Sequence, residues 1–561
     1  MKDPLKIYCV NLERYVDVEG GETLAEVAAR LAPVLDLDPI CARVNNKTED
    51  LSFPVFSPKM VEYLDASSQS GRRVYTRSLS MMLYRAVEDI LPGATLRIEH
   101  SISHGYYCRL FKPGLNEAME IAPGQVDAIK ERMREIAELD IPFVRKDRLT
   151  EDALRIFRRQ GLDAKVQLLE TTRQLYTTYY KLGDLADSYY GALAPSTGYI
   201  RVFDLIPYKE GMLLLGQDKD DPNFPASPIV QEKMYRAFTD YLKFNRIIQV
   251  SNVGELNRVV QNHKTESLIN VAEAMHDKLL GRISDEILRR HREGGARIIL
   301  IAGPSSSGKT TSAKRLAIQL MTNLMTPKMI SLDDYFVNRE NTPLDADGDY
   351  DYESLHALDL ERLNSDLSRL LAGEEINLPT YSFELGQRIE RHRPLRLGPD
   401  DVLVIEGIHG LNPELIPDLD PKDVYKVYVS ALTTLGIDDH NWISTTDNRL
   451  LRRIVRDYKY RHTSARETIR RWPSVRRGEE KWIFPFQENA DATFNSSLLF
   501  ELGVMKSYAE PLLNEVPHDC PEYTEAHRLL RFLSYFISIP ADQIPATSLL
   551  REFLGGSSFK Y

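Results

Sequence analysis

Residues 296–311 read ARIILIAGPSSSGKTT, and this stretch decides how the second half of the chain folds. Its first seven residues form a short apolar run rich in β-branched side chains, which is typical of a buried parallel strand. A glycine-containing loop follows at once, and TSAKRLAIQLMTNL after it has the pattern of an amphipathic helix. A strand, a loop and a helix in this order predict an α/β domain with a ligand loop at the end of a buried strand.

The loop at 303–310, GPSSSGKT, satisfies the Walker A pattern. Its backbone N–H groups and the following helix N-terminus are expected to surround the phosphates of ATP, while Lys309 reaches the transferred phosphate and Thr310 holds Mg²⁺. A chance match is the alternative, and the strand and helix on either side disfavour it. The predicted nucleotide-binding residues are Gly303, Ser305, Ser306, Ser307, Gly308, Lys309, Thr310 and Thr311.

Further strands are predicted at 327–333, 401–407 and 424–430, with helical segments between them, which indicates a doubly wound parallel sheet. Ligands of such sheets bind at the carboxyl ends of the strands. Two acids lie at these ends, and each alone would suit a turn or a helix cap. Beside a Walker A loop, Asp333 is predicted as the base that orients an acceptor hydroxyl, and Glu406 as an acid that binds Mg²⁺.

Arginines at 449, 452, 453 and 456 recur at helical spacing and form one stripe, with apolar residues on the opposite side. Such a stripe is most often a solvated face. Here only Asp447 and Asp457 lie near it in the sequence, so we expect little acidic compensation. Because guanidinium groups stabilise the charge that spreads over a transferred phosphoryl group, we predict a mobile lid in which Arg449 and Arg453 are catalytic.

Over residues 290–515 these motifs resemble the uridine kinase and phosphoribulokinase-like family of P-loop kinases. Besides the Walker A loop, the resemblance rests on SLD at 331–333, PTYSF at 379–383, IEGI at 405–408 and RLLRR at 449–453. It implies that Asp333 is the base, that Glu353 binds the ribose hydroxyls, that Tyr381 packs against the nucleobase and that Arg449 contacts the substrate. It also implies ATP-dependent phosphorylation of a nucleoside 5′-hydroxyl, with uridine or cytidine as the first expectation, to give the monophosphate.

One position departs from that family. Uridine kinases carry a histidine shortly after the tyrosine to read the pyrimidine edge, whereas this chain has Gly386 there. Either His392 takes that part, or the acceptor is a purine nucleoside or another sugar alcohol. A different class of function also stays open, an RNA- or ribosome-linked regulatory protein that binds ATP as a switch. The candidate base and lid favour the enzyme, since a switch needs neither.

The N-terminal half resembles a second family. Residues 1–65 are similar to the TGS domain of threonyl-tRNA synthetases, and residues 70–225 to the editing domain that follows it there, through TRSLSMML, EHSISHGYY and ADSYYGALAPSTGY. The His-x-x-x-His and Cys-x-x-x-His pairs of that editing site are replaced by Arg77, Met81, Tyr189 and Leu193. We therefore expect no zinc and no deacylation there. A scaffold or regulatory module is predicted, and binding of RNA or of a small ligand by this half stays open.

The chain has 561 residues, which is too long for one hydrophobic core. The predicted division is a TGS-like domain at 1–65, an editing-like domain at 70–225, a helical linker at 226–289, a kinase domain at 290–515 and a helical tail at 516–561. A net charge of −11 argues against a surface devoted to nucleic acid or lipid. Four scattered cysteines, no signal-like N-terminus and no long apolar span predict a cytoplasmic protein without membrane contact, and the sequence gives no sign of the oligomeric state.

Overall fold

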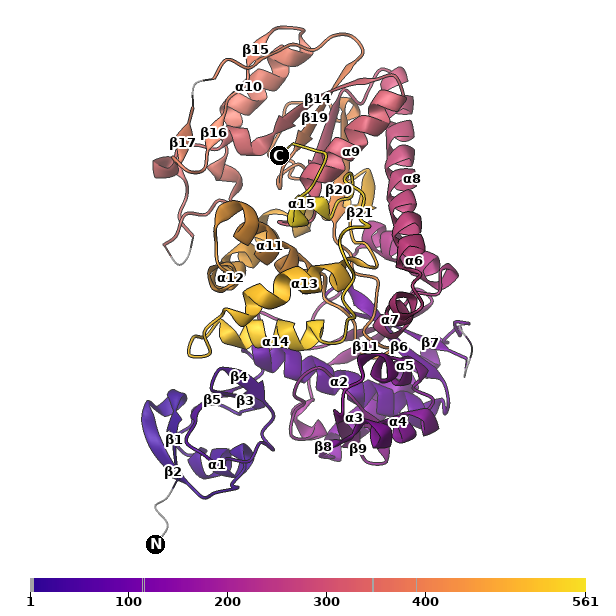
Figure 1. Ribbon diagram of the computed structural model, residues 1–561, viewed down its shortest axis with the longest axis vertical. Coiled ribbons are helices and arrows are strands. Elements are labelled where there is room, and N and C mark those ends of the chain that lie inside the picture. The colour runs from indigo at the N-terminus through magenta and orange to yellow at the C-terminus, as the bar shows by residue number, and fades with distance from the viewer. Residues whose placement is uncertain (1–4, 113–114, 116, 346–347, 390, 561) are drawn as a thin grey trace.

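The computed structural model describes residues 5–112, 115, 117–345, 348–389 and 391–560. The molecule is elongated, with the N-terminal half at one end of the long axis and the phosphate-loop sheet at the other (Figure 1). The C-terminal helices α13 (Glu501–Asn514) and α14 (Tyr523–Leu533) lie between these two ends (Figure 1). Among the helices that the structure describes, none combines the length and the hydropathy of a membrane-spanning segment.

The first unit is a small sheet covered by helix α1 (Leu24–Leu31), with strand order β2-β1-β5-β3-β4. Thr23 and Glu26 form a capping box that starts the helix, because each side chain accepts a hydrogen bond from the backbone N–H of the other. Ile7 and Val27 pack in the core between sheet and helix. The strands are β1 (Leu5–Cys9), β2 (Arg14–Val18), β3 (Cys41–Val44), β4 (Lys47–Glu49) and β5 (Met60–Leu64).

The second unit is built around the long helix α2 (Gln69–Ile90), most of which is buried between two antiparallel sheets and α3 (Pro123–Glu138). One sheet has the order β11-β12-β7-β6 and the other β10-β9-β8. The remaining elements are β6 (Thr95–Ile102), β7 (Gly105–Phe111), β8 (Phe143–Leu149), α4 (Thr150–Arg159), α5 (Asp163–Thr172), β9 (Tyr176–Leu182), β10 (Leu185–Asp187), β11 (Asp204–Tyr208) and β12 (Gly211–Leu215).

Helices α6 (Glu232–Ile247), α7 (Val253–Gln261) and α8 (Thr265–Arg292) occupy the region predicted as a helical linker. The last of these packs on α9 (Lys309–Thr322), the helix that follows the phosphate loop. Arg315 of α9 pairs with Glu273 and Asp277 of α8 at 3.0 and 2.7 Å. Apolar residues of both helices share one core with the phosphate-loop sheet. Helix α8 therefore belongs with the C-terminal half of the chain, which is called the kinase half below after the kinase domain predicted at 290–515.

The kinase half contains a parallel sheet with the order β14-β19-β13-β20-β21, which confirms the predicted doubly wound fold. Successive residues of the central strand β13 point to opposite faces: Ile298 packs in the core on the α10 side, and Ile299 in the core on the α8 and α9 side. The elements are β13 (Ile298–Ala302), β14 (Thr326–Ser331), α10 (Leu360–Leu371), β19 (Asp401–Glu406), β20 (Val424–Ser430) and β21 (Ala492–Asn495). Short pairs are formed by β15 (Ile376–Asn377) with β18 (Pro394–Leu395) and β16 (Tyr381–Ser382) with β17 (Gln387–Arg388).

The rest of the chain adds helices beside this sheet, α11 (Thr445–Arg461) and α12 (Ala465–Trp482), and then α13 and α14. Residues 516–561 were expected to be a helical tail. Within the described part of this tail only α14 and α15 (Arg551–Leu554) are α-helical, and the segment between them consists of turns, bends and irregular backbone. Prolines at 540 and 545 account for this, since proline lacks the N–H that a helix interior requires.

A buried cluster of charges joins the two halves. Lys165 of α5 pairs with Asp187 from the end of β10, and with Asp438 of the kinase half at 3.2 Å. His440 lies 2.7 Å from the same Asp187 through Nδ1 and Oδ2. All four side chains are at most 2% exposed. A buried charge is costly unless it is paired. Because the partners come from both halves, separating the halves would leave some of these charges unpaired.

Candidate active site

The phosphate loop lies between β13 and α9, as predicted. Gly303 allows a close approach, because a Cβ there would lie 2.0 Å from the Val429 carbonyl oxygen. Gly308 has a φ of +83°, in the left-handed region that favours glycine. The two glycines therefore fix the loop against the neighbouring strand and start the helix.

Several polar atoms of the loop have no partner within the described chain. The hydroxyl oxygens of Ser306 and Ser307 are buried without a hydrogen bond. Among the described residues, the Lys309 ammonium donates one hydrogen bond, to the Pro304 carbonyl of its own loop at 3.1 Å. Burial lowers the pKa of Lys309, against the opposing charges of Glu406 and Asp333. Unpartnered donors beside a lysine and a helix N-terminus fit the phosphates of ATP.

The two strand-end acids lie on the edge of the sheet that faces this loop. Glu406 Oε1 accepts hydrogen bonds from Ser331 at 3.1 Å and from Thr310 at 3.4 Å. Burial and the nearby Asp333 raise the pKa of Glu406 to about 7. Asp333 remains accessible to solvent. The protein atoms around its carboxyl still displace part of its hydration, which raises its pKa, while the positive charge of Lys309 acts in the opposite direction. A hydroxyl next to a carboxylate is a donor set that suits Mg²⁺, which is commonly held by few protein ligands together with phosphate oxygens and water.

The expectation that the arginine stripe lacks acidic partners is wrong. Arg449 is 1% exposed and forms a buried ion pair with Glu479 of α12, and its Nε donates to the Ser305 carbonyl at 2.9 Å. Arg452 is fully buried and pairs with Glu501 of α13 at 2.6 Å. Both acids come from helices that lie later in the sequence. These arginines are therefore fixed in the core beside the loop and do not form a solvated, mobile face.

Two other arginines of α11 are less buried than Arg449 and Arg452. Arg453 donates to the Ser305 hydroxyl at 2.8 Å and is held at 3.2 Å by Asp457. Arg461 is 56% exposed and pairs with the same Asp457 at 3.5 Å. Arg453 thus meets the geometric requirement for a group that contacts a nucleotide phosphate. Arg449 also contacts the loop, but its guanidinium is occupied by the Ser305 carbonyl and by the ion pair with Glu479.

Glu479 is the residue that sequence reasoning missed. Its side chain is fully buried, and Oε1 accepts from the Ser305 backbone N–H at 3.1 Å while Oε2 accepts from Arg476 at 2.9 Å. A carboxylate of α12 therefore binds a backbone amide of the phosphate loop and an arginine at the same time. The signal in the sequence is weak, because Glu479 lies in a run of charged residues, RRGEEK, that is typical of a solvated helix.

The predicted ribose ligand Glu353 lies on the acceptor side. Its Oε2 is buried without a hydrogen-bond partner in the part of the chain that the structure describes. Burial and Glu479 raise its pKa to about 7, against Arg453 and Lys309. Helix α12 reaches it through Gly478, where a Cβ would lie only 2.4 Å from the Glu353 Cβ. An unpartnered carboxylate oxygen is suited to accept hydrogen bonds from substrate hydroxyls.

The structure places Tyr381 differently from the expectation. Its ring is 8% exposed and packs against Phe336 and Phe383, with ring centroids 5.6 and 5.1 Å away. This leaves little of the ring face for a nucleobase, although the buried hydroxyl has no partner within the described chain. Gly386 has a φ of +68°, and a Cβ there would lie 2.6 Å from the guanidinium of Arg339. The backbone conformation at Gly386 and the packing of Arg339 against it therefore both disfavour the histidine that uridine kinases have at this position.

The end of the chain also reaches the phosphate loop. Leu549 lies 2.8 Å from where a Cβ of Gly308 would be. Glu552 of α15 accepts from the Thr311 hydroxyl at 2.6 Å and from its backbone N–H at 3.2 Å. Thr311, predicted as a nucleotide ligand, is therefore engaged by the tail. The segment expected to be a separate helical tail forms part of the candidate site.

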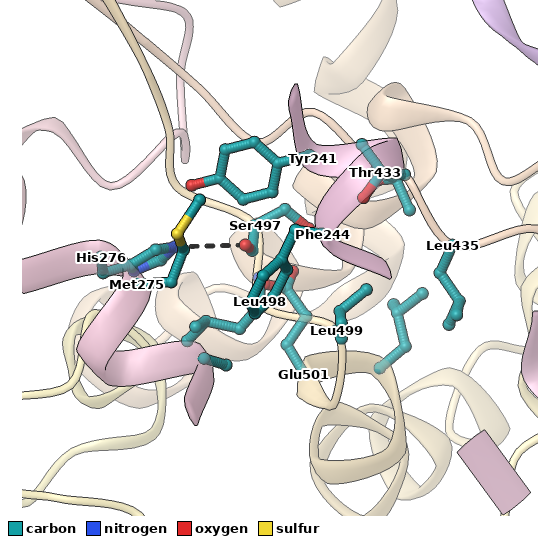
Figure 2. Close-up of a pocket in the computed structure, with 13 residues that line it drawn as sticks. Tyr241, Phe244, Met275, His276, Thr433, Leu435, Ser497, Leu498, Leu499 and Glu501 are labelled. Carbon is teal, nitrogen blue, oxygen red and sulfur yellow. Dashed lines mark hydrogen bonds between the residues drawn. The ribbon is translucent and has the colours of Figure 1, made fainter. Parts of the chain in front are cut away.

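A small cavity close to the kinase core is too small for a substrate. Figure 2 shows its lining, from Tyr241 and Phe244 of α6 to Ser497 and Glu501, with a hydrogen bond between His276 and the Ser497 carbonyl at 3.3 Å. Its volume is about 10 Å³, which is about the room that one water requires. Burial lowers the pKa of His276 to about 3, so this histidine is neutral and serves packing.

The degenerate editing-type positions lie in the core of the second unit. Met81, Tyr189 and Leu193 are at most 3% exposed. Arg77 is 8% exposed, and its Nε donates to the Ala192 carbonyl at 3.1 Å. These four side chains supply no metal ligand of the kind that the editing site of the synthetases requires.

Comparison with known proteins supports both resemblances. Residues 298–498 match the model of the phosphoribulokinase / uridine kinase family. Solved structures similar to part of the chain include a possible uridine kinase from Bacillus stearothermophilus, 22% identical over 36% of this chain and 89% of that one, with a TM-score of 0.25. Another is the D-glycerate 3-kinase from Cryptococcus neoformans, 12% identical over 46% of this chain and 87% of that one, with a TM-score of 0.22.

The N-terminal region matches threonine–tRNA ligases. The ligase of Desulforamulus reducens is 29% identical over 224 residues, which cover 38% of this chain and 34% of the relative. That of Rubrobacter xylanophilus is 31% identical over 190 residues, which cover 34% of this chain and 29% of the relative. The chain thus spans about a third of the length of the curated relatives it matches. It joins a synthetase-like N-terminal region to a P-loop kinase region that matches the uridine kinase family model.

Proposed function

We propose that the kinase half transfers the terminal phosphoryl group of ATP to the 5′-hydroxyl of a nucleoside, giving ADP and the nucleoside monophosphate. The observation that carries this proposal is the juxtaposition of Lys309 with Asp333 and Glu406 at the loop, opposite the unpartnered carboxylate oxygen of Glu353. Such a site holds a phosphate cradle, a base and a hydroxyl-binding group together. A protein that only binds nucleotide as a switch requires just the first.

Each residue has a chemical part in this proposal. Thr310 and Glu406 hold Mg²⁺, which when bound neutralises phosphate charge. Glu353 accepts hydrogen bonds from the sugar hydroxyls and so fixes the acceptor. Asp333 takes the proton of the attacking hydroxyl, and its raised pKa brings it closer to the operating pH of a general base. Lys309 and Arg453 stabilise the negative charge on the transferred group.

The nucleoside is the finer part of the proposal. It rests on Glu353, whose position suits a pair of ribose hydroxyls, and on the resemblance to uridine kinases. Gly386 and the buried Tyr381 weigh against a pyrimidine that is read as uridine kinases read it. Uridine and cytidine therefore compete with purine nucleosides and with other sugar alcohols as acceptors. A cytoplasmic location stays a prediction.

The test is ADP release from Mg²⁺-ATP by the full chain with a panel of acceptors: the common ribonucleosides, D-fructose and D-glycerate. We expect turnover with at least one nucleoside, and a loss of about 10²- to 10⁴-fold in Asp333→Asn. Asp334→Asn is the matched control, because the Asp334 carboxylate is engaged by Arg393 at 2.9 Å, and it should stay close to wild type. Turnover confined to non-nucleosides would refute the acceptor class, and full activity of Asp333→Asn would refute the base.

A further inference from the structure

A large cavity lies on the other side of helix α12 from the phosphate loop. It has a volume of about 1000 Å³ and is lined by parts of α2, β6, β7, α12 and α14. Cavities that bind small molecules commonly measure about 300 to 1000 Å³, so this one has room for a ligand of that size. Among the described residues its lining holds eight arginines and a lysine against five carboxylates, which makes it electropositive in a chain of net charge −11.

Most of this charge is already paired. Arg73 binds Glu525 at 2.7 Å, and Arg528 binds Asp447 at 2.7 Å. Arg77 is the buried exception, and the exposed Arg72 and Arg470 also lack an ion-pair partner among the described residues. Arg77 is more than nine-tenths buried, lines the cavity, and within the described chain neither terminal nitrogen of its guanidinium has a hydrogen-bond or ion-pair partner.

The fold makes room for this guanidinium. Gly191 packs directly against it, and a Cβ there would lie 2.4 to 2.6 Å from the carbon and terminal nitrogens of the Arg77 guanidinium. Burial, together with Arg73, lowers the pKa of Arg77 to about 10, against the opposing effect of Tyr190. A buried, uncompensated guanidinium is costly, and an anion with planar oxygens such as a phosphate is the natural partner for it.

The walls of the cavity add aromatic surface and accessible charge. Trp442 and Tyr106 lie with ring centroids 4.3 Å apart, and Tyr190 stands beside Arg77 with its ring 5.8 Å from the guanidinium carbon. Arg72 and Arg470 are exposed on the cavity wall and have no ion-pair partner in the part of the chain that the structure describes. Aromatic faces beside arginines are the combination that binds a base and its phosphate.

We propose that this cavity is a second ligand site that binds a free mononucleotide, with the phosphate on Arg77 and the base against the aromatic wall. The site is separate from the phosphate loop, because no residue of 303–310 lines it. A mononucleotide is favoured over an RNA strand because Arg77 is the one buried guanidinium in the described lining whose terminal nitrogens lack a partner, with Arg72 and Arg470 at the exposed wall. The chain as a whole is also acidic, which disfavours a polyanion. The proposal does not depend on the acceptor of the kinase half.

The test measures binding by isothermal titration calorimetry on the full chain in a Lys309→Ala background, which weakens nucleotide binding at the phosphate loop. The probes are AMP, GMP, CMP and UMP, with inorganic phosphate and a 12-nucleotide single-stranded RNA as comparisons. We expect a mononucleotide to bind, and Arg77→Met to weaken that binding at least tenfold. Arg155→Gln is the control, because Arg155 is 65% exposed on α4 and does not line the cavity.

Arg77 is buried, so folding of its variant is checked by circular dichroism. If Arg77→Met fails to fold, the surface pair Arg72→Gln with Arg470→Gln carries the test and is expected to weaken binding at least threefold. Mononucleotide binding that neither variant changes, or no binding up to millimolar concentration, would overturn the proposal. If inorganic phosphate binds as tightly as the mononucleotides, the aromatic wall does not bind the base. If the RNA binds more tightly than every mononucleotide, the ligand of this cavity is RNA and the proposal of a mononucleotide is wrong.

Discussion

Replacing Glu479 by glutamine removes one partner of the buried ion pair with Arg449, whose side chains are 0% and 1% exposed. Breaking a buried pair from one side leaves a charge without compensation and costs about 3–5 kcal/mol. The kinase half has the size of a domain whose midpoint temperature shifts by about 2–4 °C per kcal/mol. We therefore expect the ligand-free protein to melt about 6 to 20 °C lower than wild type by differential scanning calorimetry.

The same substitution should increase the stabilisation by nucleotide. Glu479 binds the Ser305 amide and Arg449, so in its absence both groups are available to an incoming phosphate. We expect a non-hydrolysable ATP analogue with Mg²⁺ to raise the melting temperature of Glu479→Gln by more than it raises that of wild type. Stabilisation of equal size in the two proteins would show that the carboxylate and the phosphate do not share these groups.

Glu480→Gln is the matched control for both measurements. Glu480 is the next residue of α12, is 41% exposed, and pairs with Lys219 at 2.8 Å at the surface. Exposed ion pairs contribute about 0–1 kcal/mol, so this variant should melt within a few degrees of wild type. A loss in Glu480→Gln as large as that in Glu479→Gln would refute the argument from burial.

Three further predictions follow from the same structure. Lys309→Ala should abolish phosphoryl transfer in the ADP-release assay. Its circular dichroism spectrum and melting temperature should stay near wild type, because the hydrogen bond of Lys309 among the described residues is to Pro304 in the same loop. The pKa of Glu353 is raised from 4.5 to about 7, so its contribution to stability is complete below pH 4.5 and is lost as the pH rises through 7. Glu353→Gln should therefore stabilise the ligand-free protein relative to wild type at pH 8 but not at pH 4.5. In addition, the acceptor KM of wild type should rise as the pH falls below about 7, when the carboxylate becomes protonated, whereas the KM of Glu353→Gln should not show this rise. Lys165→Met leaves Asp187 and Asp438 buried without their cation and should lower the free energy of unfolding by about 3–5 kcal/mol in urea titrations, whereas a loss below 1 kcal/mol would show that the halves do not depend on this cluster.

Three distant regions of the chain contribute to the candidate site. The loop comes from residues 303–310, the buried acid that holds Arg449 comes from α12, and the acid on Thr311 comes from the end of the chain. Because α12 also lines the large cavity through Trp472 and Arg476, one helix contacts both candidate sites. The ring of Trp472 lies 5.4 Å from the Arg449 guanidinium, so a ligand in the cavity would touch a residue that supports the phosphate loop.

The sequence by itself determined the phosphate loop, the parallel sheet and the two strand-end acids. Each of these depends on residues that are neighbours in the chain: an apolar run makes the buried strand, glycines at 303 and 308 shape the loop, and an acid at the end of a strand has to lie at the edge of the sheet. The synthetase-like character of the N-terminal region was also evident from contiguous motifs, and the comparisons confirm it.

Which arginines of the stripe are buried in ion pairs depends on the tertiary structure. Arg449 meets an acid 30 residues away, Arg452 one 49 residues away, and Thr311 one 241 residues away, and no local pattern specifies such pairs. Helical periodicity places the arginines on one face, but it does not tell which neighbouring helices will cover that face or what charge they carry. Burial and the pairing of charges are properties of the packed molecule, and they separated Arg453, which donates to the Ser305 hydroxyl of the loop, from Arg449, which is fixed in the core.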